Sequence, residues 1–302
     1  MGKKNNIMSV QSKTILISFG SNDLTRSINR LKKQAYETKF YDEVKIITED
    51  DLDKNFKIYI NKIISDGGKR GYGYFMWKPY IIKKLLSEIN YGDIINYVDV
   101  GFHIIKENYK RFKDYIKFLN DKDKWILPFQ YHSKISEEIK NISFPNREER
   151  KYSKGDLLNY YGFYNNSTVT ETPQYMAGCF FIKKCDESIN FVNEWLEIFY
   201  KRIDLVNDTQ SKLKNLHGFL ENRHDQSVFS ILCKKYNLIS FSAYECDWAY
   251  LDNKRTWIHN KNSPLIARRD LQYNLFRRFL NRQKKNFLRR KKNILNLFDK
   301  IF

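Results

Sequence analysis

The first hundred residues alternate between short apolar runs and stretches in which apolar residues recur every three or four positions. The runs cover 14–19, 44–48 and 94–98, and their length and composition predict strands buried on both faces. Between the first two runs, helical spacing predicts a helix along Leu24, Ile28, Leu31 and Ala35. A strand, a helix and a second strand in this order predict a βαβ unit, and therefore a parallel sheet.

Both patterns continue through the later part of the chain. Helical spacing and apolar runs predict helices over 81–89, 108–119, 189–199 and 228–232, and strands over 125–129 and 179–182. Residues 132–156 are polar and charged, which predicts a mobile surface loop or short helices, and residues 238–248 predict irregular strands. Because no internal repeat or low-complexity linker interrupts it, the segment 1–262 is interpreted as one α/β domain.

A carboxylate stands where the strand predicted at 94–98 ends. Asp99 follows the strand directly, and Gly101 breaks it. Ligands of open α/β sheets bind beyond the carboxyl ends of the strands. An Asp at this place suits a divalent cation and a phosphate-bearing ligand. The alternative is that Asp99 merely caps the following turn.

A second candidate region is the glycine-aromatic run that precedes the helix at 81–89. Pro79 fits the first turn of that helix. Arg70 and Lys78 flank the run near the helix N-terminus, an arrangement that favours binding of phosphate. Ordinary loop packing is the alternative interpretation.

The net charge of the 302-residue chain is +19, and +10 of it lies in residues 265–302. About half of the excess positive charge therefore lies in an appended basic segment rather than on the surface of the domain. Apolar residues recur through this segment at spacings of three, four and seven, which predicts an amphipathic basic helical extension over 263–302 that lies on an anionic membrane surface. The alternative is a helix packed on the domain with a solvated charged face.

The cysteine pattern bears on the compartment. The four cysteines show no CxxC pair or metal-finger spacing, and the N-terminal sequence does not read as a signal peptide. Together these features predict reduced thiols in a cytoplasmic protein. With the basic extension, they predict a protein bound peripherally to the inner face of the membrane.

Four short motifs, in this order, resemble bacterial GT-A-fold glycosyltransferases of capsule and lipopolysaccharide biosynthesis, distantly similar to glycosyltransferase family 8. They are GYGYFMWKPY (71–80), YVDVG (97–101), TPQYMAG (172–178) and RHDQS (223–227), with a weaker match in KYSKGDL (151–157). The resemblance covers residues 14–262 and implies a GT-A fold, a nucleotide-sugar donor and a glycan or lipid-linked acceptor.

The resemblance also implies roles for individual residues. Asp99 takes the first position of an Asp-x-Asp motif that holds Mn²⁺ or Mg²⁺ against the donor diphosphate, but Gly101 replaces the second carboxylate. His259 is the candidate for a further metal ligand, near the phosphate-binding Lys261. Operation without metal, with Arg70, Lys78 and Lys261 countering the diphosphate, is the alternative.

The other motifs supply the remaining candidates. Asp225 and Gln226 are assigned to the acceptor and donor-sugar side of the site, with a helix N-cap as the structural alternative for Asp225. Gln174 and Gly178 are assigned to the pocket floor. By analogy of fold alone, Ser18, Phe19 and Gly20 lie near the nucleotide base and ribose.

The function predicted from the sequence is transfer of a sugar from a nucleotide-diphosphate donor to a glycan or lipid-linked acceptor of surface polysaccharide biosynthesis, by a hexosyltransferase. A capsule-type sugar-phosphate transferase is the closest alternative. A nucleic-acid-binding protein is suggested by the charge, but the charge is concentrated in one segment, and no zinc-finger, RRM or KH signature is present. We therefore expect no nucleic-acid partner.

Overall fold

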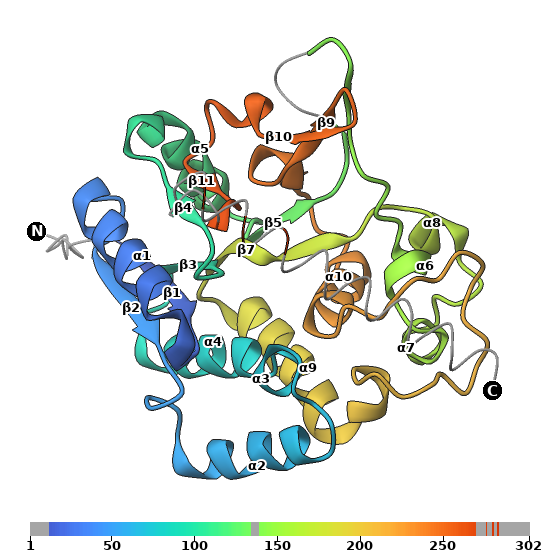
Figure 1. Ribbon diagram of the computed structural model, residues 1–302. Coiled ribbons are helices and arrows are strands. Elements are labelled where there is room, and N and C mark those ends of the chain that lie inside the picture. The colour runs from blue at the N-terminus through green and yellow to red at the C-terminus, as the bar shows by residue number, and fades with distance from the viewer. Residues whose placement is uncertain (1–11, 134–138, 270–275, 277–279, 281–282, 284–302) are drawn as a thin grey trace, which may run out of the picture. The chain divides into compact units, whose positions relative to one another are not determined.

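The computed structural model describes residues 12–133, 139–269, 276, 280 and 283 (Figure 1). Its centre is a six-stranded sheet with the order β2 (Glu43–Ile47), β1 (Thr14–Phe19), β3 (Ile94–Val98), β7 (Tyr175–Lys183), β5 (Ile126–Gln130) and β8 (Phe241–Ser242). β1 is parallel to β2 and β3, and β5 is parallel to β8, while β7 runs antiparallel between β3 and β5. The predicted α/β class is confirmed, and the sheet, predicted to be parallel, is mainly parallel with β7 as the antiparallel strand.

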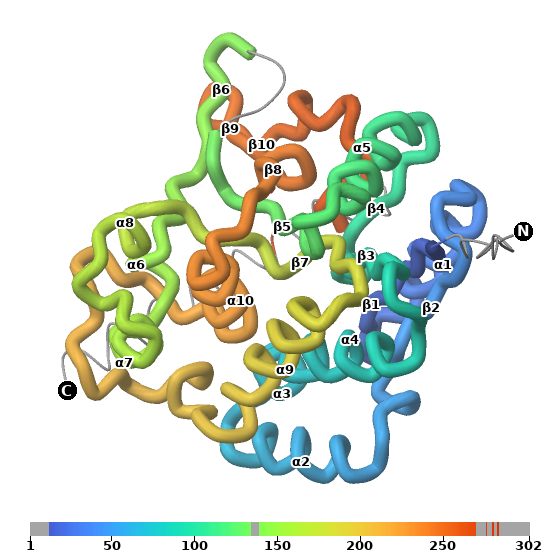
Figure 2. The backbone as a smooth tube through the Cα atoms, turned by 180° about the vertical axis from the view of Figure 1, so that it is seen from behind, coloured from blue at the N-terminus to red at the C-terminus, as the bar shows by residue number. Residues whose placement is uncertain are grey.

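Helices cover both faces of the sheet (Figures 1 and 2). One face packs against α1 (Thr25–Thr38) and α5 (Tyr109–Asn120), and the other against α2 (Lys54–Ser65), α4 (Trp77–Glu88), α9 (Asp186–Lys201) and α10 (Asp225–Lys235). Successive residues of β1 alternate between the two cores: Ile15 and Ile17 belong to one and Leu16 to the other. Each such fully buried aliphatic side chain contributes about 1.5–3 kcal/mol.

Two small sheets and several short helices lie outside the central layers. One sheet joins β6 (Ile142–Ser143), β9 (Ala249–Leu251) and β10 (Lys254–Thr256), and the other joins β4 (His103–Ile104) and β11 (Leu265–Ile266). The short helices are α6 (Glu149–Tyr152), α7 (Gly155–Tyr160) and α8 (Ser167–Thr170). The region 132–156, predicted to be loop or short helices, thus includes α6, where Glu149 is fully buried.

The contacts divide the chain into a unit that ends at Ala267 and a second unit that begins at Arg268. The predicted basic helix lies, from residue 270 on, outside the described residues except for Phe276, Leu280 and Gln283. Within the part of the chain that the structure describes, no helix combines the length and apolar character needed to cross a membrane.

The glycine-aromatic run forms a left-handed turn, α3 (Gly71–Tyr74). The φ angle is positive at five consecutive residues, from 60° at Gly71 to 65° at Phe75. The backbone N–H of Tyr74 donates to Arg70 O at 2.8 Å, and that of Phe75 donates to Gly71 O at 3.1 Å. Left-handed backbone costs roughly 1–2 kcal/mol at each residue other than glycine. The surrounding packing must therefore stabilise this turn, which leads directly into α4.

Gly73 is expected to be indispensable to the turn. A Cβ atom there would lie 2.4 Å from Ile60 Cγ1, at a φ of +76°. Gly162 provides a control, because its φ is +74° but no atom lies within 4 Å of its Cβ position. We expect Gly162→Ala to destabilise the protein by about 1 kcal/mol from backbone strain alone. Gly73→Ala should cost about 1–3 kcal/mol more because of the overlap. Urea unfolding of both variants measures the difference, and equal losses would contradict this account.

Candidate active site

A cavity of about 280 Å³ opens at the edge of the sheet where β1 and β3 end. It is lined by Arg70 and Phe75, which flank α3, and by residues from the N-termini of α4 and α10, the segment after β3, and the first half of β7. Because β7 is antiparallel to β3, its first residues reach the edge at which β3 ends. The cavity thus lies beyond the carboxyl ends of parallel strands, where open α/β sheets bind ligands.

Lys78 stands between two carboxylates at the base of this cavity. Its Nζ lies 2.5 Å from Asp225 Oδ2 and 3.6 Å from Asp99 Oδ1. The side chains of Lys78 and Asp225 are only 4% and 5% exposed, whereas that of Asp99 is 45% exposed. Asp99 is therefore the carboxylate that a ligand can reach, and Asp225 holds the ammonium from behind.

Burial and neighbouring charges together set the protonation of Lys78 and Asp225. Burial raises the pKa of Asp225 to about 6, although the Lys78 ammonium opposes the shift. Burial by itself would lower the pKa of Lys78, but Asp225 and Asp99 outweigh it and hold that pKa above its ordinary value. Near neutral pH the group therefore carries one positive charge between two negative ones.

Three aromatic rings surround the Lys78 ammonium. Its Nζ lies 5.6 Å, 5.8 Å and 5.1 Å from the ring centroids of Phe75, Trp77 and Tyr97. Phe75 reaches this position because it ends the left-handed turn. Rings at these distances attract a cation, so the turn helps to hold the Lys78 ammonium in place, while Asp225 and Asp99 keep it charged.

Asp99 is oriented by its neighbours on β3 and β7. Its Oδ1 accepts a hydrogen bond from Tyr97 Oη at 2.7 Å, and its backbone N–H donates to Gly178 O at 2.8 Å. A Cβ atom at position 178 would lie 3.0 Å from Asp99 Oδ2. The Asp99 carboxylate therefore packs closely against Gly178, which is assigned to the pocket floor from the sequence.

Arg30 on α1 fixes the segment that follows Asp99. Its guanidinium donates to the carbonyl oxygen of Phe102 and, at 2.7 Å, to that of Val100. Gly101 lies between these two anchored residues. In the glycosyltransferases that the motifs resemble, a second carboxylate is usual at the position of Gly101. Here that position is part of a loop that Arg30 of α1 holds in place.

The cavity brings together six of the residues proposed from the sequence: Arg70, Lys78, Asp99, Gly178, Asp225 and Gln226. Gln174 is fully buried and lies behind Gln226, whose Nε2 donates to Gln174 Oε1 at 3.0 Å. Ser18, Phe19 and Gly20 lie at the same edge of the sheet, at the end of β1, but do not line the cavity.

His259 and Lys261 are not brought to Asp99 in the described structure, since neither lines the cavity. His259 is buried, and its Nε2 lies 3.0 Å from the carbonyl oxygen of Asp247, to which it donates. Burial lowers the pKa of this histidine.

The residues around Asp99 do not fit a metal site built by the protein. The Lys78 ammonium lies against Asp225 and Asp99, so a divalent cation there would face repulsion and gain few oxygen ligands. Among the described residues, no group of three or more His, Cys, Asp and Glu side chains could hold a metal ion.

Arg223, Tyr131 and Asp247 also line the cavity, although no role could be assigned to them from the sequence. The Arg147 guanidinium lies 3.9 Å from the Tyr131 ring centroid, and its Nη2 lies 3.1 Å from Asp247 Oδ2. The Arg223 guanidinium lies 3.6 Å from the ring of Tyr152. Only Arg223 gave a sequence signal, as part of the motif RHDQS.

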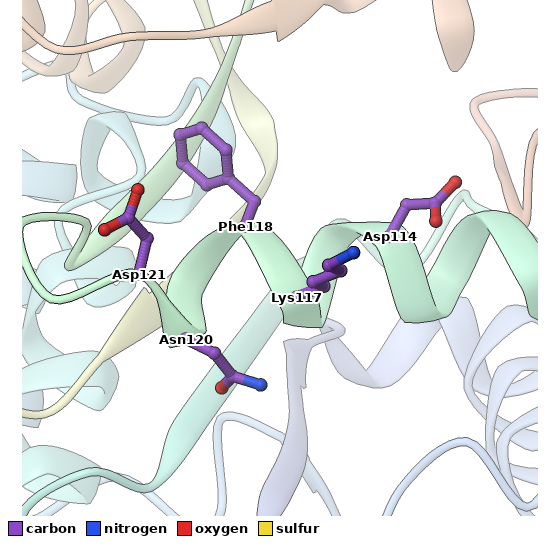
Figure 3. A pocket seen from close by; sticks show the side chains of 5 residues that line it. All are labelled: Asp114, Lys117, Phe118, Asn120 and Asp121. Carbon is purple, nitrogen blue, oxygen red and sulfur yellow. The ribbon is translucent and has the colours of Figure 1, made fainter.

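A larger hollow of about 540 Å³ lies on α5 and the residues after it (Figure 3). Its lining residues are Asp114, Lys117, Phe118, Asn120 and Asp121. The side chains of Phe118 and Asn120 point to opposite sides, and the polar groups do not converge on one point. The smaller cavity, with converging charged groups, is the better candidate for chemistry.

No protein-family model and no curated protein matches this sequence. Three solved structures similar to the chain are described as glycosyltransferases. One is involved in glycosylation of the major capsid of PBCV-1 (TM-score 0.42, 11% identity, covering 84% of this chain and 91% of that chain). Another is mouse xyloside xylosyltransferase 1 in its apo form (0.41, 10%, 78% and 86%). The third is apo GlyE of Streptococcus pneumoniae TIGR4 (0.35, 12%, 77% and 46%). At TM-scores below 0.5, these overlaps carry no argument about the activity of this chain.

Proposed function

We propose that this chain is a glycosyltransferase of the GT-A type, which moves a hexosyl group from a nucleotide-diphosphate donor to a glycan or lipid-linked acceptor. The observation that carries the proposal is the group formed by Lys78, Asp99 and Asp225 at the carboxyl edge of the sheet. The four motifs that resemble this class support it, because three of them supply these residues: Lys78, Asp99 and Asp225.

The proposed reaction breaks the bond between the anomeric carbon and the diphosphate oxygen, which leaves with the electron pair. An acceptor hydroxyl oxygen bonds to the anomeric carbon, and its proton passes to an oxygen of the departing diphosphate. Positive charge develops on the sugar in the transition state, and the Asp99 carboxylate, fixed by Tyr97, is the reachable group that stabilises it. A fixed charge stabilises the transition state more than the ground state, because it needs no reorganisation.

The cations of the cavity have a separate role. Arg70 and Arg223 line it and can meet the negative charge of the departing diphosphate. Lys78 is already paired with two carboxylates, so its part is to hold Asp99 in place and to share its charge. Asp225, which is buried behind Lys78, acts through the ammonium rather than on the sugar.

The proposal is tested by incubating the full chain with a panel of UDP-, GDP- and dTDP-sugars, with and without Mn²⁺. Release of nucleoside diphosphate from one of them, raised by added glycan or lipid-linked acceptor, is expected. Release of nucleoside monophosphate from a diphosphate sugar would instead indicate a sugar-phosphate transferase. No turnover and no thermal stabilisation by any donor would refute the proposal.

We also propose that the enzyme works in surface polysaccharide biosynthesis at the inner face of the membrane. The pathway rests on the resemblance of the four motifs, and the support for the membrane location is the +10 charge of residues 265–302, since each Lys or Arg near an anionic leaflet contributes ~1 kcal/mol. We expect the full chain to sediment with vesicles that contain anionic lipid and to stay in solution with neutral vesicles. Added salt should release it. Equal sedimentation with both kinds of vesicle would contradict this proposal.

A further inference from the structure

A series of buried hydrogen bonds runs from the interior to Gln226 at the cavity. It begins at Glu149 on α6, which is completely buried. The Glu149 carboxylate accepts from four donors: Lys234 Nζ at 2.8 Å, Ser153 Oγ at 2.6 Å, Ser230 Oγ at 2.5 Å and Gln174 Nε2 at 2.8 Å. Gln174 Oε1 then accepts from Gln226 Nε2 at 3.0 Å. We call Glu149, Gln174 and Gln226 the amide relay.

The carboxylate determines the direction of every bond in this relay. An ionised carboxylate can only accept, so Gln174 must turn its NH₂ group toward Glu149. The carbonyl oxygen of Gln174 then faces Gln226, which must in turn present its own NH₂ group. The Gln226 side chain uses its NH₂ group within the relay, which leaves its carbonyl oxygen available. Because Gln226 lines the cavity, this oxygen can accept a hydrogen bond from a ligand.

We infer that Glu149 is a positioning residue, which acts through Gln174 to present the Gln226 carbonyl oxygen to a hydroxyl group of the transferred sugar. This inference rests on the glycosyl transfer proposed above. It assigns a specificity: the cavity selects a sugar with a hydroxyl donor at the place that Gln226 faces. A sugar without that hydroxyl leaves the oriented carbonyl unpaired, and sites built to bond a substrate hydroxyl reject such analogues strongly.

The composition of the relay favours this role over a purely structural one. Packing alone would be served equally well by apolar side chains, since a buried ion pair such as Glu149 with Lys234 is often no more stable than a hydrophobic replacement. The relay also does not stop in the core, because its last member is the neighbour of Asp225 in the cavity wall. The buried charge of Glu149 adds something that apolar side chains would not, namely a fixed orientation of the Gln226 amide in the cavity.

Substitution of Glu149 by Gln should remove this orientation with almost no change in volume. The new amide offers an NH₂ group as well as an oxygen, so Gln174 and Gln226 can both reverse. Gln226 would then present NH₂ instead of a carbonyl oxygen to the sugar. Glu148→Gln is the matched control, because Glu148 is the adjacent carboxylate and pairs with Arg150 and Lys151 at the surface.

The measurement uses the nucleotide sugar that the wild-type full chain turns over fastest and its singly deoxygenated analogues. The readout is the ratio of kcat/KM for the sugar to kcat/KM for each analogue. This ratio does not depend on the fraction of folded enzyme, so a merely structural loss would leave it unchanged. We expect a ratio of about 100 or more at one hydroxyl position in the wild type and in Glu148→Gln. In Glu149→Gln it should fall at least about tenfold.

If Glu149→Gln does not fold, Gln174→Met interrupts the relay at its middle and should lower the same ratio to a similar extent. An unchanged ratio in a folded relay variant, with wild-type turnover present, would overturn the inference and leave the proposed function intact. Absence of turnover by the wild type with every donor would overturn the proposed function itself, and the inference with it.

Discussion

Asp99→Asn is expected to reduce sugar transfer by roughly 10²–10³ while the protein stays folded. Asn keeps the size of the side chain and still accepts a hydrogen bond from Tyr97, but it carries no charge to oppose the positive charge on the sugar. The loss corresponds to about 3–4 kcal/mol of transition-state stabilisation. Because the Asp99 side chain is 45% exposed, we expect a change of less than about 1 kcal/mol in the free energy of unfolding.

Asp123→Asn is the matched control for this experiment. Asp123 is exposed and precedes β5, and β5 runs parallel to β3, so it lies at the opposite edge of the sheet from Asp99. Initial rates with the donor identified in the panel, and urea unfolding of both variants, give the comparison. Transfer by Asp99→Asn within threefold of the control would refute a central role for this carboxylate.

Two inner strands of the sheet, β1 and β3, could be predicted from the sequence to the residue. β1 and β3 match the predicted runs 14–19 and 94–98. Parallel strands are buried on both faces, so they are continuous apolar runs that need no knowledge of the rest of the fold. The antiparallel direction of β7 could not be predicted in this way, because a buried strand has the same composition in either direction.

The buried charges could not be predicted, because each depends on a partner far away in the chain. Lys78 and Asp225 are separated by 147 positions, and Glu149 meets Lys234 only in the folded protein. In the sequence, Glu149 lies in a charged run that is typical of a solvated surface. Charged residues are almost never fully buried unless they are paired. Only the fold could therefore show that this one is interior.

The left-handed turn shows a different limit of prediction from the sequence. Gly71 and Gly73 tolerate positive φ, and their presence indicates an unusual backbone. Tyr72, Tyr74 and Phe75 adopt positive φ against their own preference. Local sequence argues against such a conformation, so packing around the cavity must supply the compensation. Strain of this kind is often found at functional sites.

Lys78→Met is expected to have the largest combined effect on stability and transfer. It leaves Asp225 buried without its ammonium partner, and breaking a buried pair typically costs about 3–5 kcal/mol. It also frees Asp99 from the group that holds it, so transfer should fall by at least about 10². Lys84→Met, on the same helix, is the control: Lys84 is 46% exposed and pairs with Asp53 at 2.9 Å. That substitution should cost about 0–1 kcal/mol and leave transfer unchanged.

The loss of stability should depend on pH in a way that identifies Asp225. The pKa of Asp225 is about 6 in the folded wild type, above its ordinary value. A raised pKa means that the stability contributed by the bound proton is complete below the ordinary pKa and is lost as pH rises through about 6. Without Lys78, the pKa of Asp225 should rise further, so the variant keeps losing stability above pH 6, where the wild type has levelled off.

Unfolding in urea at two pH values therefore tests this assignment. The difference in free energy of unfolding between the wild type and Lys78→Met should be small near pH 5, where Asp225 is protonated in both proteins. It should grow by at least about 1.4 kcal/mol near pH 8, which corresponds to one unit of pKa. Lys84→Met should show no such growth, because its partner Asp53 is exposed. A difference that stays constant from pH 5 to pH 8 would mean that the protonation of Asp225 is not coupled to Lys78. The interpretation of Lys78 and Asp225 as a buried ion pair would then be wrong.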